Sequence, residues 1–376
     1  MKRILISGGA GFIGSNLTKK LVEKGYVVTI LDNLSEQIHG KSSDSVLYDT
    51  IKSISRFIKG DVRNKDDWQK AIDNQDAIIH LAAETGTGQS MYEKEKYTDV
   101  NIGGTKNLID LLFNMNHQIQ KVVVASSRAI YGEGKYSCNQ HGIDFPVQRI
   151  ESDLLAGKFN PICKQCNREL SLLPTDEETS INPLSYYGET KYEQERILMK
   201  MGEDLNIPTV ALRYQNVYGP GQSLSNPYTG ILSIFSTRML NGNPVDIYED
   251  GKESRDFVFI NDVVDATILA LENKNANNES FNVGSGIGTT VEEVAQMLKA
   301  KYNSNVDLVI SGKFRIGDIR HNIADLTKAK QLLGFEPKVG FAKGILEFVE
   351  WVKKQEVQKD KYDESIKELK DKGLMR

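Results

Sequence analysis

Tyr187 and Lys191 are the two residues of this sequence whose types and spacing best suit proton transfer. They lie four residues apart, which places both side chains on one face of a helix. A free tyrosine titrates near pH 10, so a tyrosine that acts as a general base at neutral pH needs a lower pKa. The neighbouring Lys191 ammonium would favour the phenolate. Because Tyr-x-x-x-Lys also occurs on many surface helices, the pair predicts a site only together with other residues.

Ser126 and Ser127 are such residues. They end an apolar run that begins near Lys121, and we expect them at the carboxyl end of a buried strand. Ligands of open α/β sheets bind at that end of the strands. A serine hydroxyl there can orient a hydroxyl or carbonyl group of a substrate towards the tyrosine.

A glycine-rich turn at residues 8–14 (GGAGFIG) directly follows the first apolar run. Gly8 permits a tight exit from a strand, Gly11 lets the backbone approach a phosphate, and Gly14 lets the next helix pack close to the sheet. The N-terminus of that helix attracts a pyrophosphate. A surface turn would use glycines too, but Asp32 ends the next apolar run, where a carboxylate can bind a ribose diol. No arginine follows Asp32 closely and a carboxylate repels a 2′-phosphate, so the pattern predicts NAD rather than NADP.

All three cysteines lie in one segment together with a histidine, at Cys138, His141, Cys163 and Cys166. Cys-x2-His and Cys-x2-Cys are spacings typical of zinc ligands. The alternative is a loop with unligated thiols. A segment so poor in apolar residues gains stability from a metal, and four protein ligands leave no open position for catalysis. We therefore expect a structural zinc ion, in an insert that covers the mouth of the substrate pocket.

The composition is that of a globular protein, with 376 residues, 39% of them hydrophobic, and a formal net charge of −4. This charge gives no reason to expect nucleic acid or an anionic membrane as a partner. No stretch approaches the roughly 20 apolar residues of a membrane span. The first residues lead into a strand rather than a signal peptide, and three cysteines form no disulfide framework. We expect a cytoplasmic protein.

Apolar runs alternate with amphipathic stretches in the first half of the chain, which favours a doubly wound parallel (Rossmann) α/β sheet. His80 would end one buried strand, where a histidine is more often structural than catalytic. The pattern breaks between Tyr131 and Pro183, which indicates an insert. The predicted organisation is an NAD-binding domain of residues 1–218 and 257–284 carrying the insert 132–183, a smaller C-terminal substrate-binding domain of residues 219–256 and 285–354, and a charged, solvated helix at 355–376.

Taken together, these features resemble the extended short-chain dehydrogenases/reductases of the nucleotide-sugar epimerase and dehydratase group. The resemblance covers nearly the whole chain and is carried by residues 8–14, 61–62, 80–83, 126–127, 187–191, 213–220 and 255–258. It implies NAD as cofactor and a nucleotide diphosphate sugar as substrate. It also implies a homodimer that pairs through helices near Asp99–Asn114 and Tyr187–Met201.

By this resemblance, Tyr187 is the catalytic base, Lys191 modulates it and binds the nicotinamide ribose, and Ser127 is the catalytic hydroxyl. Besides Lys191, the implied NAD-binding residues are Gly8, Gly11, Phe12, Ile13, Gly14, Asp32, Asn33, Asp61, Val62, Leu81, Ala82 and Ala83. The implied substrate-binding residues are Thr87, Asn216, Arg255 and Arg315. Arginine suits phosphate oxygens because its fork donates two parallel hydrogen bonds; surface ion pairing is the alternative role.

One departure from the family pattern narrows the reaction. The sugar 4,6-dehydratases of this group carry Asp-Glu directly after the catalytic hydroxyl, whereas this chain has Arg128-Ala129, which argues against dehydration. More narrowly, residues 84–91, 126–131 and the insert resemble bacterial dTDP-L-rhamnose 4-epimerases. We expect inversion of C4 of a nucleotide diphosphate sugar, with dTDP-L-rhamnose favoured, through a 4-keto intermediate. A 4-keto nucleotide-sugar reductase or dehydrogenase is the first alternative, and a non-catalytic NAD-sensing regulator is the second.

Overall fold

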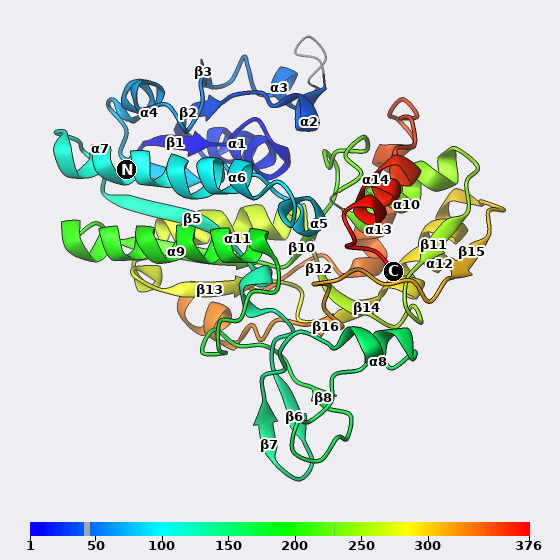
Figure 1. The fold of residues 1–376 in the computed structure, drawn as a ribbon. Coiled ribbons are helices and arrows are strands. Elements are labelled where there is room, and N and C mark those ends of the chain that lie inside the picture. Colours follow the sequence, from blue (N-terminus) through cyan, green and yellow to red (C-terminus); the bar gives the residue numbers. More distant parts are fainter. Residues whose placement is uncertain (41–45, 229) are drawn as a thin grey trace.

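The central element of the fold is a parallel sheet of seven strands in the order β13-β9-β5-β4-β1-β2-β3 (Figure 1). The computed structural model describes residues 1–40, 46–228 and 230–376. This doubly wound α/β sheet confirms the predicted fold class. The strands are β1 (Arg3–Ser7), β2 (Val27–Asp32), β3 (Arg56–Lys59), β4 (Ala77–His80), β5 (Lys121–Ser127), β9 (Thr209–Tyr214) and β13 (Ser280–Val283).

Two hydrophobic cores cover the two faces of this sheet. Ile4 and Ile6 of β1 belong to one core with α1 (Phe12–Glu23) and α11 (Ile260–Glu272). Leu5, which points the other way, belongs to a second core with α4 (Lys65–Ile72), α7 (Gly104–Asn114) and α9 (Tyr186–Leu205). Strands buried on both faces need apolar residues at successive positions, which explains the near-continuous apolar runs of the sequence.

A smaller region lies beside the carboxyl ends of the strands (Figure 1). Its apolar side chains continue the core on the α1 and α11 side of the sheet. β12 pairs here rather than in the central sheet, although it precedes α11 directly. The division into two domains at the predicted boundaries stays a prediction. The elements of this region are β10 (Asn216–Tyr218), α10 (Ile231–Leu240), β11 (Val245–Ile247), β12 (Ser254–Phe259), β14 (Gly288–Thr290), α12 (Val291–Tyr302), β15 (Leu308–Ile310), β16 (His321–Asn322) and α13 (Phe341–Val352).

The insert forms a small unit that projects from the body of the protein (Figure 1). It contains an antiparallel sheet of β6 (Tyr136–Cys138), β7 (Gly142–Asp144) and β8 (Ser171–Leu172). The short helix α8 (Glu151–Leu155) lies between β7 and β8 in the chain. Its own hydrophobic cluster has four buried members, Tyr136, Cys138, Cys163 and Leu170. Two of the four are cysteines, so apolar packing alone holds this unit weakly.

The C-terminal segment differs from the prediction of a solvated helix over residues 355–376. Its helix, α14, is shorter and spans Tyr362–Asp371, with Tyr362 and Leu369 buried. Glu368 accepts a hydrogen bond from the phenol of Tyr228 at 2.6 Å, and Met375 forms a β-bridge with Arg315. The charged composition hid an apolar face with a period of three to four residues, which is what packs α14 against the protein.

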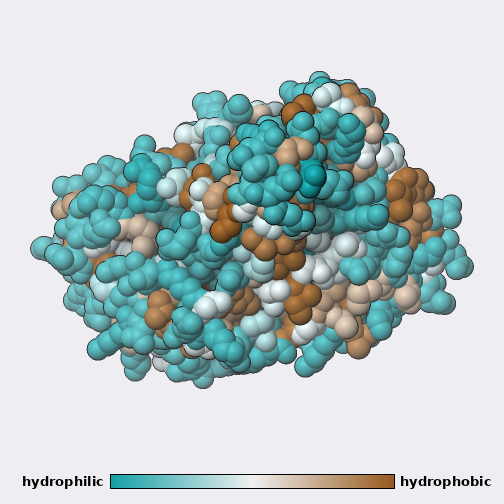
Figure 2. Space-filling model, turned by 90° about the horizontal axis from the view of Figure 1, so that it is seen from below, coloured by the Kyte–Doolittle hydropathy of each residue, from teal (hydrophilic) through white to brown (hydrophobic). Residues whose placement is uncertain are grey.

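The face of the protein drawn in Figure 2 is mainly hydrophilic. On the face drawn in Figure 2, apolar residues form small groups separated by polar ones. Within the described ranges of the chain, no helix is long and apolar enough to cross a membrane.

Candidate active site

A cavity of about 450 Å³ runs along the carboxyl ends of the central strands. This volume is in the range of small-molecule and cofactor sites. It brings together most residues that the sequence singles out: Gly8, Gly11, Phe12, Ile13, Gly14, Asp32, Asn33, Val62, Leu81, Ala82, Ala83, Thr87, Ser127, Tyr187, Lys191 and Asn216 all line it. Asp61, Arg255 and Arg315 are not among its described lining residues.

The glycine turn gives the cavity a smooth backbone wall. Gly8 has φ +70°, and a Cβ atom there would lie 2.7 Å from the backbone nitrogen of Ala82. A Cβ atom on Gly14 would lie 2.5 Å from the Cα of Gly9, so α1 starts too close to the turn for any side chain. Gly11 is open, because only the oxygen of Gly8 comes within 3.4 Å of its would-be Cβ. This leaves the N-terminus of α1 bare towards the cavity, as a bound pyrophosphate requires.

Asp32 is held at the end of β2 by the glycine turn itself. Its carboxylate accepts hydrogen bonds from the backbone N–H groups of Ala10 and Leu34, each at 2.9 Å. Burial raises the pKa of Asp32, and these two N–H groups oppose that shift. Asp61 instead pairs with Arg63 at 2.8 Å and accepts from Asn33 at 3.1 Å. Asp61 is therefore joined to the cavity lining by its hydrogen bond with Asn33, and its predicted contact with NAD stays a prediction.

The first turn of α9 brings Tyr187 to Ser127. Ser185 caps this helix by accepting a hydrogen bond from the N–H of Gly188 at 3.1 Å. A Cβ atom on Gly188 would lie 2.6 Å from the backbone oxygen of Ala129, so α9 touches the chain just after β5. The Tyr187 phenol and the Ser127 hydroxyl both line the cavity as a result, close enough for Ser127 to lower the pKa of the phenol.

The electrostatic setting of Tyr187 differs from the one predicted. Burial raises the pKa of the Tyr187 phenol, while its hydrogen bond with Ser127 and the positive charge of Arg128 lower it. The expectation that the Lys191 ammonium brings the pKa below its usual value is therefore wrong for the protein without ligands. The reason is that burial outweighs the nearby charges, and the charge that acts on the phenol is that of Arg128.

Lys191 lies one turn further along α9 and is almost completely buried. Burial lowers its pKa to about 7, and the carboxylate of Glu195 opposes this shift. The ammonium donates to Gln194, whose amide nitrogen lies 2.9 Å from Nε2 of His80. Burial lowers the pKa of His80 to about 3, so this histidine is neutral and serves as a support behind Lys191, in line with its predicted structural role.

Arg255 and Arg315 meet at one carboxylate instead of reaching into the cavity. Asp318 accepts from Arg255 at 3.2 Å and from Arg315 at 2.6 Å. Burial alone would raise the pKa of Asp318, but Arg315, Arg255 and also Arg128 hold it well below its usual range. The two arginines predicted to touch the substrate thus lie behind the described lining, on either side of Asp318.

Several polar atoms that line the cavity have no hydrogen-bond partner among the described residues. They are Ser126 Oγ, both side-chain polar atoms of Gln215, Asn216 Oδ1 and Gln222 Oε1. Buried polar atoms normally have partners, so this set fits ligands that carry many donors and acceptors, such as a dinucleotide and a nucleotide sugar. The sequence analysis assigned Asn216 to the substrate, but the sequence gave no signal for Gln215.

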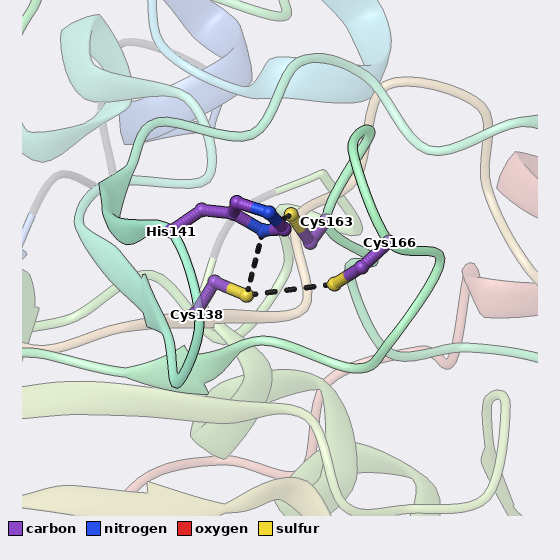
Figure 3. Close-up of side chains that lie close together, drawn as sticks. All are labelled: Cys138, His141, Cys163 and Cys166. Carbon is purple, nitrogen blue, oxygen red and sulfur yellow. Dashed lines mark hydrogen bonds between the residues drawn. The ribbon is translucent and has the colours of Figure 1, made fainter.

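The four predicted metal ligands converge in the insert (Figure 3). Cys138 Sγ lies 3.6 Å from Cys166 Sγ and 3.5 Å from Nδ1 of His141, which lies 3.4 Å from Cys163 Sγ. Tetrahedral zinc with Zn–S bonds of about 2.3 Å separates its ligand atoms by about 3.5–3.8 Å. Cys138 and Cys166 are too far apart for a disulfide, and all four ligand atoms lie within 4.8 Å of one another, which is close enough for them to converge on one ion.

The insert does not cover the cavity as predicted, because none of its described residues lines it. It reaches the substrate side of the protein through Arg149 instead. The Arg149 guanidinium donates to both oxygens of Glu249 at 2.8 and 2.7 Å and to the backbone oxygen of Asp318 at 3.0 Å. All three side chains are largely buried, so a change in the insert would move the segment that carries Asp318.

The sequence was compared with protein families and known proteins. The profile of the NAD dependent epimerase/dehydratase family matches residues 4–162 and 166–284. The chain belongs to this family. The dTDP-L-rhamnose 4-epimerase of Burkholderia thailandensis is 35% identical to this family member over 354 residues, which cover 93% of this chain and 95% of that protein.

Two crystal structures of similar enzymes support the same assignment. UDP-glucose 4-epimerase of Thermotoga maritima with UDP-glucose aligns with a TM-score of 0.75 and 32% identity, covering 94% of this chain and 99% of that chain. UDP-glucuronic acid 4-epimerase of Bacillus cereus, in complex with UDP-glucuronic acid and NAD, aligns with a TM-score of 0.75 and 26% identity, covering 93% and 99%. This family member is thus similar to NAD-dependent nucleotide-sugar 4-epimerases over most of its length.

Replacing the buried phenol tests its role in turnover. Tyr187→Phe should lower kcat by about 100-fold or more, since general acid–base groups contribute about 10²–10⁴-fold. Tyr186→Phe is the matched control, because the neighbouring phenol bonds to Thr98 at 2.6 Å and does not line the cavity. Steady-state kinetics with a nucleotide sugar would give kcat for both variants and so test whether the Tyr187 phenol takes part in turnover. Equal kcat values for the two variants would remove Tyr187 from the chemistry.

The low pKa of Lys191 predicts a pH-dependent stability. At pH below about 7 the folded protein buries a charged ammonium, so Lys191→Met should raise the melting temperature by about 2 °C or more. Between about 7 and 10.5 the unfolded chain binds a proton that the folded protein lacks, so wild-type stability rises with pH relative to the variant. Thermal melts of wild type and Lys191→Met near pH 6 and pH 10 would measure this effect. If the difference between their melting temperatures is the same at both pH values, the prediction is contradicted.

Proposed function

We propose that this enzyme inverts C4 of a nucleotide diphosphate hexose through a 4-keto intermediate, with dTDP-L-rhamnose as the favoured substrate. The observation that carries the proposal is that Ser127, Tyr187 and Lys191 line the same cavity as the glycine turn. Similarity to the dTDP-L-rhamnose 4-epimerase of Burkholderia thailandensis over 93% of this chain favours that hexose.

In this proposal, Tyr187 removes the proton of the sugar 4-hydroxyl and later returns one to the 4-keto oxygen. Ser127 would hold the same sugar oxygen, because its hydroxyl lines the cavity beside the phenol. Bound NAD would supply the redox chemistry, namely removal of hydride from C4 and its return to the opposite face of the keto sugar. The glycine turn and Asp32 would hold its pyrophosphate and adenosine ribose, and Lys191 its nicotinamide ribose.

The acids and bases around the cavity argue for epimerisation rather than dehydration. Among the described lining residues, the carboxylates are Asp32 and Glu84. Asp32 is occupied by backbone N–H groups, and Glu84 pairs with Lys96 at 3.1 Å. The chain has Arg128-Ala129 where a dehydratase of this group needs an Asp-Glu pair. Removal of water from the sugar therefore has no pair of free carboxyl groups available among the described lining residues.

Incubation with sugar nucleotides tests the proposed function against its alternatives. The purified protein, with no added cofactor, should interconvert dTDP-L-rhamnose and its C4 epimer with no net change in NAD, as seen by NMR and absorbance near 340 nm. A requirement for stoichiometric NAD(P)H would instead assign a 4-keto reductase or dehydrogenase, which would use the same residues. NAD binding without turnover of any sugar nucleotide would favour a regulator.

We also propose a cytoplasmic homodimer. The three unpaired cysteines suit a reducing compartment. The predicted pairing elements, α7 and α9, lie side by side on one face of the sheet in Figure 1, where two copies could form a four-helix contact. Light scattering at micromolar concentration should give twice the monomer mass of 42.1 kDa, and a monomer would contradict the proposal.

We further propose that Cys138, His141, Cys163 and Cys166 bind one structural zinc ion. Their close spacing and the small hydrophobic cluster of the insert support a metal that stabilises this unit. No Lewis acid is needed at the sugar, and the four ligands line no part of the described cavity. The metal would act on substrate binding only through Arg149 and the segment at Asp318.

Removing two ligands tests the zinc proposal. The double variant Cys163→Ser/Cys166→Ser should lose about one zinc ion per chain, melt at a lower temperature and bind substrate more weakly, with NAD affinity retained. Lys164→Ser, an exposed position in the same Cys-x2-Cys turn, is the control. Elemental analysis and calorimetry would provide the data. Wild-type protein without stoichiometric metal contradicts the site, whereas zinc loss with normal substrate binding contradicts only the coupling through Arg149.

A further inference from the structure

Gln194 is a buried glutamine of α9 whose side chain lies directly behind the ammonium of Lys191. The two residues are three positions apart, so they share one face of the helix. Gln194 is completely buried and is not among the described lining residues of the cavity, whereas Lys191 is. The ammonium donates a hydrogen bond to the amide oxygen Oε1 of Gln194. Within the part of the chain that the structure describes, this oxygen is the one hydrogen-bond acceptor of the ammonium.

Two neighbouring side chains determine which way the Gln194 amide faces. Its nitrogen Nε2 lies 2.9 Å from Nε2 of His80 and 2.9 Å from the hydroxyl oxygen of Thr105. Burial lowers the pKa of His80 to about 3, so this histidine is neutral and one of its ring nitrogens is an acceptor. The Thr105 hydroxyl donates to the backbone oxygen of Asn101 at 2.6 Å, which leaves its oxygen to accept. Because both neighbours need a donor, the amide nitrogen faces them and Oε1 faces Lys191.

This contact has two effects on Lys191. An ammonium has three N–H donors, and Gln194 takes one of them from behind, which leaves two for the cavity side. A lysine side chain has a flexible four-carbon stem, so the contact also fixes where those two donors point. The second effect concerns charge. Burial lowers the pKa of Lys191 to about 7, and an acceptor oxygen favours the charged form, because an ammonium is a stronger donor than an amine.

We propose that Gln194 is a positioning residue of the reaction, which aims the ammonium of Lys191 at the cavity and keeps it charged. The inference rests on the proposed function, since it assumes that the charged Lys191 serves bound NAD and the base Tyr187. Gln194 itself touches neither the cavity nor a ligand, so it acts through Lys191 alone. His80 and Thr105 take part indirectly, because they hold the amide in the orientation that Lys191 needs.

The other charged and titratable groups around Lys191 stay in place when Gln194 is changed. They are Tyr187 and Glu195 on α9, His80 on β4, Arg213 on β9, which pairs with Glu195 at 2.7 Å, and Arg128 in the 3-10 turn η2 (Arg128–Tyr131), which acts on Tyr187. α7 presents the neutral Thr105 to the same network. A shift in the titration of Lys191 between Gln194 variants therefore reports the contact with the amide.

The pH dependence of kcat with dTDP-L-rhamnose tests the positioning role. Activity that needs the charged Lys191 is lost as the pH rises through its pKa, which gives the alkaline limb of the profile. In Gln194→Leu this limb should move to lower pH by about one to two units, because a lost hydrogen bond to a charged group corresponds to a factor of about 10–100. At pH 7, kcat should fall about 10-fold with KM nearly unchanged.

The conservative variant Gln194→Glu should move the same limb in the opposite direction. A carboxylate beside the amine favours the charged form, so the alkaline limb should move to higher pH. His80 can donate to this carboxylate from Nε2, because Ser7 Oγ, 2.5 Å from its Nδ1, can donate in return. Gln75→Leu is the matched control, since it removes another buried glutamine amide that is not among the described lining residues. Its profile should match that of wild type.

A thermal double-mutant cycle tests the contact without substrate or turnover. At pH 6, where Lys191 is charged, Gln194→Leu should lower the melting temperature of wild type by about 2 °C or more beyond its effect in Lys191→Met. This difference should shrink near pH 10, where the amine is neutral.

Each other outcome overturns the proposal. Equal effects of Gln194→Leu in both backgrounds would show that the amide serves only the packing of α9. Alkaline limbs that do not move, or that move in the same direction in both variants, would show that Gln194 does not control the charge of Lys191. If Gln194→Leu does not fold, Gln194→Glu alone must move the limb to higher pH, and its failure to do so overturns the assignment. A wild-type protein that converts no sugar nucleotide overturns the proposed function instead, and the thermal cycle separates the two failures because it needs no substrate.

Discussion

The parallel alignment of the seven central strands is the constraint on which the rest of the structure depends. Because all strands end at the same edge, the glycine turn after β1, Asp32 at the end of β2, the segment after β4 and Ser127 at the end of β5 meet in one cavity. Each of these groups is far from the others in the sequence. Strand direction alone, before any specific contact forms, thus determines where a dinucleotide and its substrate can bind.

A second constraint, the contact between α9 and the chain after β5, sets the catalytic geometry. Since Gly188 lies against the oxygen of Ala129, the backbone positions of Ser127 and Tyr187 are fixed relative to each other by the packing of a helix of 20 residues. Behind this contact, Gln194 and His80 hold Lys191 in a site where burial favours its neutral form. This protein thus keeps a destabilising buried amine where an apolar side chain would pack more easily, as is common for functional sites.

The sequence predicted those parts of the fold and site that depend on local pattern. Apolar runs, the glycine turn and Tyr-x-x-x-Lys follow from backbone geometry over a few residues, and the four zinc-spaced residues do meet as their spacing suggests. Prediction failed where distant segments determine the outcome. Nothing in the sequence indicates that Arg255 and Arg315 contact Asp318, or that Arg255 also contacts three backbone oxygens, and the assignment of both arginines to the substrate stays a prediction. Arg149 and Gln215 had no signal for the same reason, and the charge of α14 concealed its buried face.

The contacts of α14 also have a consequence for the rate at which ligands enter and leave. Glu368 binds Tyr228, which lines the cavity from the smaller region, while Leu369 lies near Gly88 and the ammonium of Lys372 lies 5.8 Å from the ring of Tyr92, both on the segment after β4. The same short helix is therefore fastened to both walls. If the walls move apart, α14 must lose its contacts with one of them, so opening of the cleft is coupled to partial release of this helix.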